Sequence, residues 1–350
     1  MDTATAAALL EITETSRAAF RRQEPGAEVL VEARYADILE AFQWLLDRAE
    51  LTTARRLARS LVNFWMSTSR LPDGDTWFER LLAGPLTRDQ DVALSLHEHG
   101  YLIFWAGDYE RSSRRFTEAR VMAAELGDAS IEALALAGLA RVALTYDVAK
   151  AVRLLREALV ITEGLPDDSD GRGSALHVLG PALQMAGDFE GARAVIERRI
   201  ALARTTGSNF VVWAETGNLS TVERQLGNLD RAEELSLQAV ASDIVATREL
   251  FLAWTLNGLA AVTAAQGRAE RAAVLLGAAD ALMERAGGGW PPDEREQYGQ
   301  TRAVLTRDLP ADQLERATAC GQALPPDAVV NYALHGDGTR NLNRHPRAVY

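Results

Sequence analysis

The sequence predicts an all-α fold, an α-solenoid of antiparallel helix pairs, and three observations support this prediction. A pattern of leucine, small residue, glycine and alanine recurs about every forty residues. Apolar residues follow helical spacing through most of the chain. With 350 residues and 47% hydrophobic content, the chain is long enough for one continuous array in which each helix pair buries its apolar face against its neighbours.

The repeat is clearest from Leu176 to Ile196, which indicates a helix, a tight turn and a second helix. The position of Leu179 holds His99, Leu139, Leu219 and Leu259 in the other copies, and the residue that follows is always small. Eight residues after this position come Gly107, Asp147, Gly187, Gly227 and Gly267. Thirteen residues after it come Ser112, Val152 (with Ala151 beside it), Ala192, Ala232 and Ala272.

Each repeat position has a physical reason. The glycine ends the first helix because it adopts the left-handed conformation without strain. Asp188 or Asn228, directly after the glycine, is a favoured N-cap for the second helix. The small residues allow the two helices to approach closely.

Residues 1–90 are expected to form a helical capping region that does not follow the register of the repeat. An amphipathic helix over 1–22 places Leu9, Leu10, Ile12 and Phe20 on its apolar side, and helical spacing continues from 29 to 50. Thr52 and Thr53 offer an N-cap for a helix through Trp65. The stretch 71–75 (Leu-Pro-Asp-Gly-Asp) predicts a turn before a helix that starts at Thr76.

Five repeats are expected over 91–286, followed by a helical cap over 287–334 and a disordered tail over 335–350. An acidic, glycine-rich loop at 164–173 interrupts the array, either as a functional lid or as a longer connection. Pro181 indicates a kink that opens the inner surface, or a helix that begins late.

The spacing of the repeat resembles the tetratricopeptide repeat (TPR), stretched by longer helices. More narrowly, the chain resembles the C-terminal helical-repeat region of actinobacterial LuxR- and SARP-type transcriptional regulators, in which this region follows a signalling ATPase domain. The matching stretches are 35–44, 61–65, 77–82, 271–280 and the segment from Trp290 to Leu334. The resemblance covers roughly residues 30–335 and implies a right-handed superhelix.

Composition limits the classes of partner. A net charge of −12 argues against direct binding of nucleic acid, which needs a clustered basic surface. Cys320 is the single cysteine, so an intramolecular disulfide is excluded and a reducing cytoplasm is expected. The start of the chain lacks the basic region of a signal peptide, and no apolar stretch reaches membrane-spanning length. We therefore expect a cytoplasmic protein.

Motifs for catalysis, cofactors and metals are missing from the sequence. His97 and His99 are two residues apart, which on a helix separates their side chains by about 200 degrees, so the pair does not predict a metal site. Neither a phosphate-binding loop nor a nucleophile elbow occurs. The ATPase and helix-turn-helix motifs of the regulators are not found. No cofactor is predicted.

The remaining candidate for a functional site is a binding surface. The resemblance implies that first-helix residues at fixed offsets from the leucine position line a concave groove. These positions are His97, Tyr101, Phe104, Trp105, Arg141, His177, Gln184, Met185, Arg224, Gln225, Trp254 and Asn257. Aromatic residues, arginine and amides are typical of recognition surfaces.

The leading hypothesis is a non-enzymatic binding module that holds a peptide, a protein segment or a small acidic effector in this groove and is linked to transcriptional or signalling control. One alternative is an enzyme of secondary metabolism with His97, His177 and Arg141 as acid-base groups; a buried histidine or a shifted pKa at the groove floor would favour it. Another is a homo-oligomeric scaffold, which exposed apolar residues such as Leu9, Leu10 and Phe20 would favour.

Overall fold

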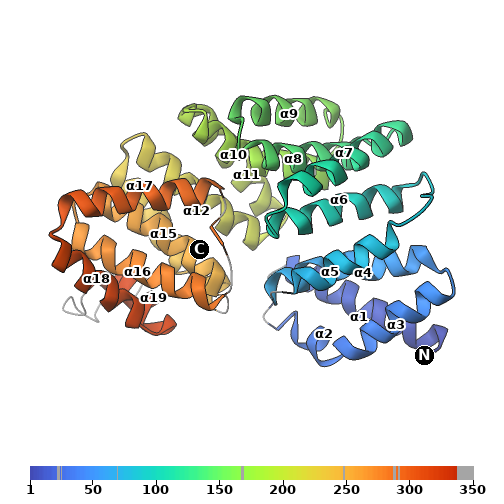
Figure 1. Ribbon diagram of the computed structural model, residues 1–350. Coiled ribbons are helices and arrows are strands. Elements are labelled where there is room, and N and C mark those ends of the chain that lie inside the picture. The colour runs from blue at the N-terminus through green and yellow to red at the C-terminus, as the bar shows by residue number, and fades with distance from the viewer. Residues whose placement is uncertain are drawn as a thin grey trace. The chain divides into compact units, whose positions relative to one another are not determined.

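The computed structural model describes residues 1–21, 24, 26–68, 70–166, 169–246, 249–286, 289–290 and 292–336. Every regular element in these residues is an α-helix, which confirms the predicted all-α fold (Figure 1). Contacts within the chain divide it into two compact units, Met1–Val212 (unit 1) and Trp213–Tyr350 (unit 2). The division between the units falls inside the stretch 91–286 that the repeat pattern assigns to one array.

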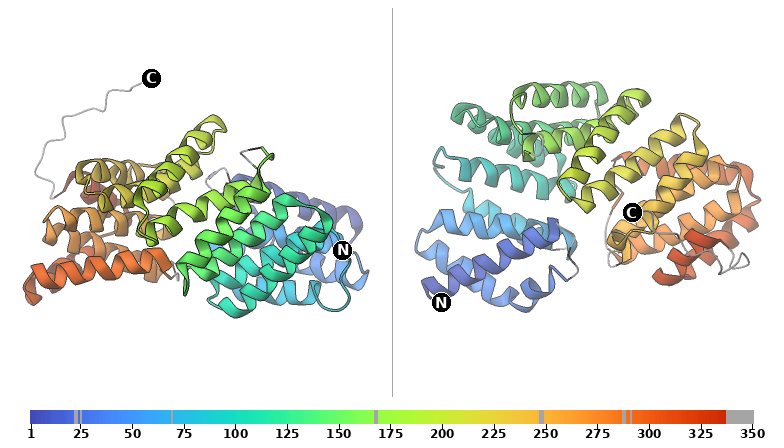
Figure 2. Two further views of the ribbon diagram at one scale, coloured as in Figure 1. Left: turned by 90° about the horizontal axis from the view of Figure 1, so that it is seen from above. Right: turned by 180° about the vertical axis from the view of Figure 1, so that it is seen from behind.

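Unit 1 is a succession of helices of which each packs against the next ones in the chain (Figure 2). Its helices are α1 (Thr3–Arg21), α2 (Val29–Ala33), α3 (Tyr35–Asp47), α4 (Leu51–Ser67), α5 (Leu71–Leu81), α6 (Gln90–Trp105), α7 (Tyr109–Leu126), α8 (Ala129–Ala143), α9 (Val148–Ile161), α10 (Asp170–Met185) and α11 (Phe189–Thr205). The first helices of three repeats, α6, α8 and α10, contact one another in order, while α7, α9 and α11 are their second helices.

The repeat positions act as the sequence predicts. Gly107 and Gly187 adopt left-handed φ values of 86° and 80° at the ends of their helices. A Cβ atom on Gly100 would lie 2.9 Å from the ring of Phe116, so the small residue allows α6 and α7 to approach closely. Asp188 caps α11 by accepting a hydrogen bond from the Gly191 N–H at 3.0 Å.

Residues 29–50, where the apolar spacing is helical, form two helices, α2 and α3. Two other predictions about the N-terminal elements are wrong in detail. Helix α4 begins at Leu51 with Glu50 as its N-cap, so Thr52 and Thr53 lie in its first turn. Residues 71–75 are the first turn of α5 and not a turn before it.

Gly74 explains the last of these errors. A Cβ atom at this position would lie 2.5 Å from Leu102 and 2.6 Å from Trp65, both fully buried side chains. The glycine is therefore required where α5 packs closely on α4 and α6, and it does not mark a reversal of the chain. As a consequence, Asp75 lies on a helix beside Glu79.

Pro181 lies well inside α10, which begins at Asp170, so the prediction of a late helix start is wrong. Asn228 is the N-cap residue of α13, as the sequence predicts, but its side chain makes no N-cap hydrogen bond. Its amide instead donates to the Glu223 carboxylate at 2.6 Å.

Unit 2 continues with helix pairs. Its helices are α12 (Asn209–Gln225, which starts in the last residues of unit 1), α13 (Leu229–Val240), α14 (Asp243–Ala246), α15 (Glu249–Ala265), α16 (Ala269–Arg285), α17 (Pro292–Asp308), α18 (Ala311–Ala323) and α19 (Pro326–His335). Helices α16 and α18 pack at Gly277 and Gly321, where a Cβ atom on Gly321 would lie 1.9 Å from the Val274 carbonyl oxygen. Of the tail predicted over 335–350, residues 337–350 lie outside the described residues.

Candidate functional site

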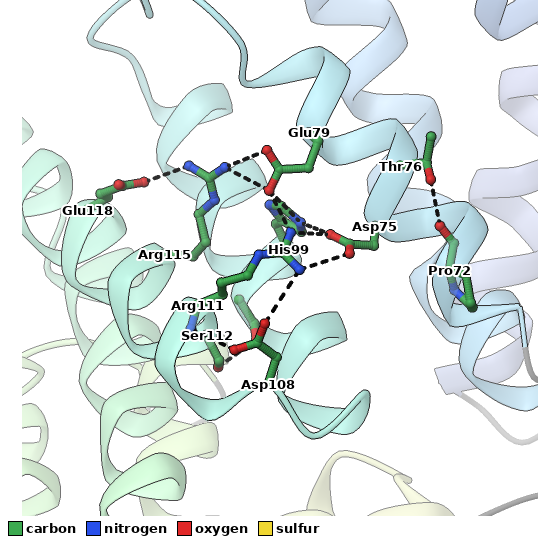
Figure 3. Close-up of polar contacts among 11 residues, drawn as sticks. Pro72, Asp75, Thr76, Glu79, His99, Asp108, Arg111, Ser112, Arg115 and Glu118 are labelled. Carbon is green, nitrogen blue, oxygen red and sulfur yellow. Dashed lines mark hydrogen bonds and ion pairs between the residues drawn. The ribbon is translucent and has the colours of Figure 1, made fainter.

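A cluster of charged side chains joins three helices of unit 1 (Figure 3). It comprises Asp75 and Glu79 on α5, His99 on α6, and Arg111 and Arg115 on α7, and we refer to it as the α5–α7 cluster. Residues four apart share one face of a helix, so each acidic and each basic pair projects in one direction. His99 occupies the position that holds leucine in the other four repeats, which brings a polar ring into the interior.

Arg111 is the centre of the cluster. Its guanidinium donates to both carboxylate oxygens of Asp75, at 3.0 and 2.8 Å, and to Glu79 at 2.7 Å. Arg115 donates to both oxygens of Glu79, at 3.2 and 3.1 Å. The two parallel hydrogen bonds from Arg111 to Asp75 are the strong form of pairing between arginine and carboxylate.

His99 contributes a ring that is completely buried and stacks on Phe78 at a centroid distance of 5.2 Å. Its Nε2 atom lies 2.8 Å from an Asp75 carboxylate oxygen. The carboxylate can only accept, so the ring donates through Nε2. Its Nδ1 atom is buried without a hydrogen-bond partner.

Burial lowers the pKa of His99 below its usual 6.5, although the hydrogen bond to Asp75 acts in the opposite direction. Burial would raise the pKa of Asp75, but the hydrogen bonds from Arg111 and His99 outweigh it and hold that pKa below 3.8. The pKa of Glu79 is lowered in the same way by Arg111 and Arg115. At neutral pH the cluster therefore holds two carboxylates, two guanidinium groups and a neutral imidazole.

One oxygen from each of Asp75 and Glu79 and a nitrogen of His99 lie within 4.8 Å of one another, a spacing that could hold a metal ion. Both carboxylates already have a full complement of arginine partners. A divalent ion would have to displace Arg111, and Arg115 would remain beside it as a like charge. The arrangement fits a structural tie between helices better than a metal centre.

The sequence pattern does not predict this cluster, because it places Asp75 in a turn. One signal was present: a histidine replaces the leucine of the repeat at position 99, and a buried histidine needs a polar partner. The two histidines of α6 do face different neighbours, since His97 lies 5.4 Å from the ring of Phe116 and His99 packs on Phe78.

The predicted groove positions of unit 1 fall into two groups. His97 and Phe104 are buried, at 8% and 6% exposure, whereas the other positions are partly exposed. Tyr101, Trp105 and Arg141 lie together: the Arg141 guanidinium is over the Tyr101 ring at 5.7 Å, and Tyr101 meets Trp105 edge to face at 6.1 Å. This set, the Tyr101–Arg141 surface, spans the adjacent first helices α6 and α8. The partly exposed positions on α10 are His177, Gln184 and Met185.

In unit 2 the predicted groove positions are again divided between buried and partly exposed residues. Asn257 is completely buried, and its amide donates to the Glu294 carboxylate at 2.6 Å, joining α15 to α17. Arg224, Gln225 and Trp254 are partly exposed. Trp254 packs on Phe251, with ring centroids 5.5 Å apart.

No protein-family model matches this sequence. Curated proteins similar to it include candidate HTH-type transcriptional regulators of Mycobacterium tuberculosis and Mycobacterium bovis, which are 28% identical over 236 residues. The similarity covers 63% of this chain, and the chain spans about a quarter (26%) of the length of those regulators.

Among solved structures, NprR in complex with its cognate peptide NprX has a TM-score of 0.53 at 13% identity, covering 87% of this chain and 86% of that chain. TPR-like repeats related to a Podosopora anserina kinesin light chain give a TM-score of 0.44 at 19% identity, over 55% of this chain and 94% of that chain. The likeness to NprR shows the fold. The chain is a TPR-like helical-repeat protein similar to a candidate transcriptional regulator, as the sequence predicts.

None of the helices in the described residues combines the length and the apolar character that a membrane crossing requires.

Proposed function

We propose that this chain is a non-enzymatic binding module in transcriptional control, which holds an acidic peptide or protein segment on the exposed face of its first helices. Two findings support the class of function. The curated relatives are named as regulators, and the NprR fold, which this chain shares, is solved with a bound peptide. We also propose a cytoplasmic location, because the single cysteine fits a reducing compartment.

The observation that carries the proposal is the Tyr101–Arg141 surface. Arg141 makes no ion pair among the described residues, although the chain has an excess of acidic groups and most half-buried arginines of unit 1 are paired. Its guanidinium is held over an aromatic ring beside a second one, Trp105. Arginine, tyrosine and tryptophan are the residue types that most often dominate binding energy at interfaces, and here an arginine lies over one aromatic ring that contacts a second.

The test is native mass spectrometry of the protein purified from its own host. We expect a peptide or protein segment to co-purify with the wild type and to be lost in the variant Trp105→Ala with Arg141→Ala. Arg153→Ala is the charge-matched control for Arg141, because Arg153 is exposed on α9, a second helix. Equal retention of the ligand in all variants would contradict the proposal.

His97 supports a second candidate, an enzyme that uses this surface as its active site. The residue is 8% exposed, its Nδ1 atom has no hydrogen-bond partner, and burial lowers its pKa. A neutral imidazole can accept a proton, and burial and the charge of Arg141 both keep His97 neutral by lowering its pKa. This candidate predicts that the wild type, but not His97→Gln, consumes a compound from a metabolite extract of the host, as measured by mass spectrometry.

The scaffold alternative receives no such support from its diagnostic residues. Leu9 and Leu10 are buried in the core of unit 1, at 1% and 7% exposure, and Phe20 is partly exposed.

A further inference from the structure

We propose that Arg224 of unit 2 binds a carboxylate group of the partner. This inference deepens the proposed function, on which it rests, by naming the chemistry that one first helix recognises. Arg224 lies in the last turn of α12, five residues after the leucine position of its repeat.

The guanidinium of Arg224 is poorly satisfied. Among the described residues, its buried Nε atom has no hydrogen-bond partner. Within the same part of the chain its one hydrogen bond is from Nη2 to the Gln297 side-chain oxygen, and at 3.4 Å it is longer than the usual range for N–H···O bonds. No carboxylate of the described residues pairs with Arg224, and burial is the cause that lowers its pKa.

The side chain that the Arg224 guanidinium contacts is polar but not acidic. The neighbouring Glu223 accepts a hydrogen bond from Asn228 at the turn that follows α12. Gln297 of α17 is 5% exposed and presents an amide oxygen. One turn earlier on α17, Glu294 is engaged by Asn257 of α15. Helix α17 thus reaches both α12 and α15, and it brings an amide rather than a carboxylate to Arg224.

A half-buried cation without a counter-ion is costly, because the guanidinium cannot lose its proton to escape desolvation. Proteins retain such groups mainly where a ligand supplies the missing charge, at the expense of stability in the free state. The planar fork of arginine matches a carboxylate with two parallel hydrogen bonds. An acidic peptide or protein segment, the class of partner proposed above, provides this group.

The experiment measures thermal unfolding of the full chain with sodium acetate and sodium glutarate as probes, each against sodium chloride at equal ionic strength. Without probe, Arg224→Gln should raise the Tm of unit 2 by about 2 °C, because the uncompensated charge is removed. Each carboxylate should raise the Tm of the wild type but not that of Arg224→Gln. Arg302→Gln is the matched control, since Arg302 is exposed on α17, and it should retain the wild-type response.

Equal carboxylate responses in wild type and Arg224→Gln would overturn the inference, as would a lower Tm of Arg224→Gln without probe. Inorganic phosphate is tested in the same way. A rise in the Tm of the wild type with phosphate but not with acetate or glutarate would overturn the assignment to carboxylate. The native mass spectrometry described above uses residues of unit 1, so the two proposals fail separately. Loss of the co-purified ligand in the unit 1 variant, with no carboxylate response at Arg224, would refute only this inference.

Discussion

Arg111 of unit 1 and Arg224 of unit 2 are two arginines in opposite electrostatic situations. Arg111 is 32% exposed and engages two carboxylates, and the hydrogen bond to Asp75 is the main cause that raises its pKa. Arg224 is half-buried, lacks a carboxylate partner within the described residues, and has a pKa lowered by burial. This difference is the basis on which we propose that Arg111 holds helices together and that Arg224 binds a ligand.

The comparison also explains why the more conspicuous cluster is the weaker functional candidate. The α5–α7 cluster contains a histidine, two carboxylates and two guanidinium groups, but each carboxylate is paired with a guanidinium group. By contrast, Arg224 and Arg141 have no carboxylate partner among the described residues. In a chain with a net charge of −12, an arginine without an acidic partner is the more informative feature.

The largest effect is expected when the paired cluster is broken. Asp75→Ala should lower the free energy of unfolding of unit 1 by about 2 to 3 kcal/mol, because it leaves Arg111 and the buried His99 without their shared acceptor. Hydrogen exchange of the α5, α6 and α7 amides measures this loss. Glu110→Ala removes an exposed ion pair with Arg114 and should cost less than about 0.5 kcal/mol. Similar losses in both variants would refute the structural role of the cluster.

A slightly smaller loss should follow when the helix that carries Asp75 is displaced. Gly74→Ala introduces a Cβ atom 2.6 Å from the rigid ring of Trp65 and should cost about 2 kcal/mol. The control is Gly217→Ala on α12, where no atom lies within 4 Å of the added Cβ. That change should stabilise unit 2 by about 0.5 to 1 kcal/mol, because alanine is the better helix former. Urea denaturation distinguishes the two signs.

The smallest effect on stability is expected when the pH is lowered. The pKa values of His97 and His99 lie below 6.5 because the rings are buried, so unfolding of unit 1 takes up protons. The stability that the neutral rings contribute is complete above pH 6.5 and is lost as the pH falls below it. Between pH 7 and 5.5 each histidine should therefore lower the stability of unit 1, by at most about 1 kcal/mol.

His97→Gln should reduce this loss by about half, as measured by denaturation at several pH values. The carboxylates of Asp75 and Glu79 do not contribute to the pH dependence in this range, because their pKa values are below 3.8 and 4.5. An unchanged pH dependence in His97→Gln would show that this histidine is not the responsible group. The charged groups around His97 are Glu98, Asp170, Arg141 and Arg17.

The sequence by itself determined the repeat and its helices. Periodic leucine, glycine and alanine are local signals, since each acts within one helix pair: Gly187 ends its helix at φ 80° and Asp188 caps the next. The same signals placed Tyr101 and Arg141 at equivalent positions of adjacent repeats, and the structure brings those two side chains into contact.

Tertiary structure decided which residues pair and which are buried, because these properties depend on residues that are distant in sequence. Only the packing of Gly74 on Trp65 and Leu102 shows that 71–75 is helical, and with it comes the pairing of Asp75 with Arg111, thirty-six residues away. Burial of His97, Phe104 and Asn257 likewise follows from neighbouring helices and not from their offsets in the repeat. Whether an arginine meets a carboxylate, as Arg111 does and Arg224 does not, is a property of the assembled helices, since the opposite charge comes from another part of the chain.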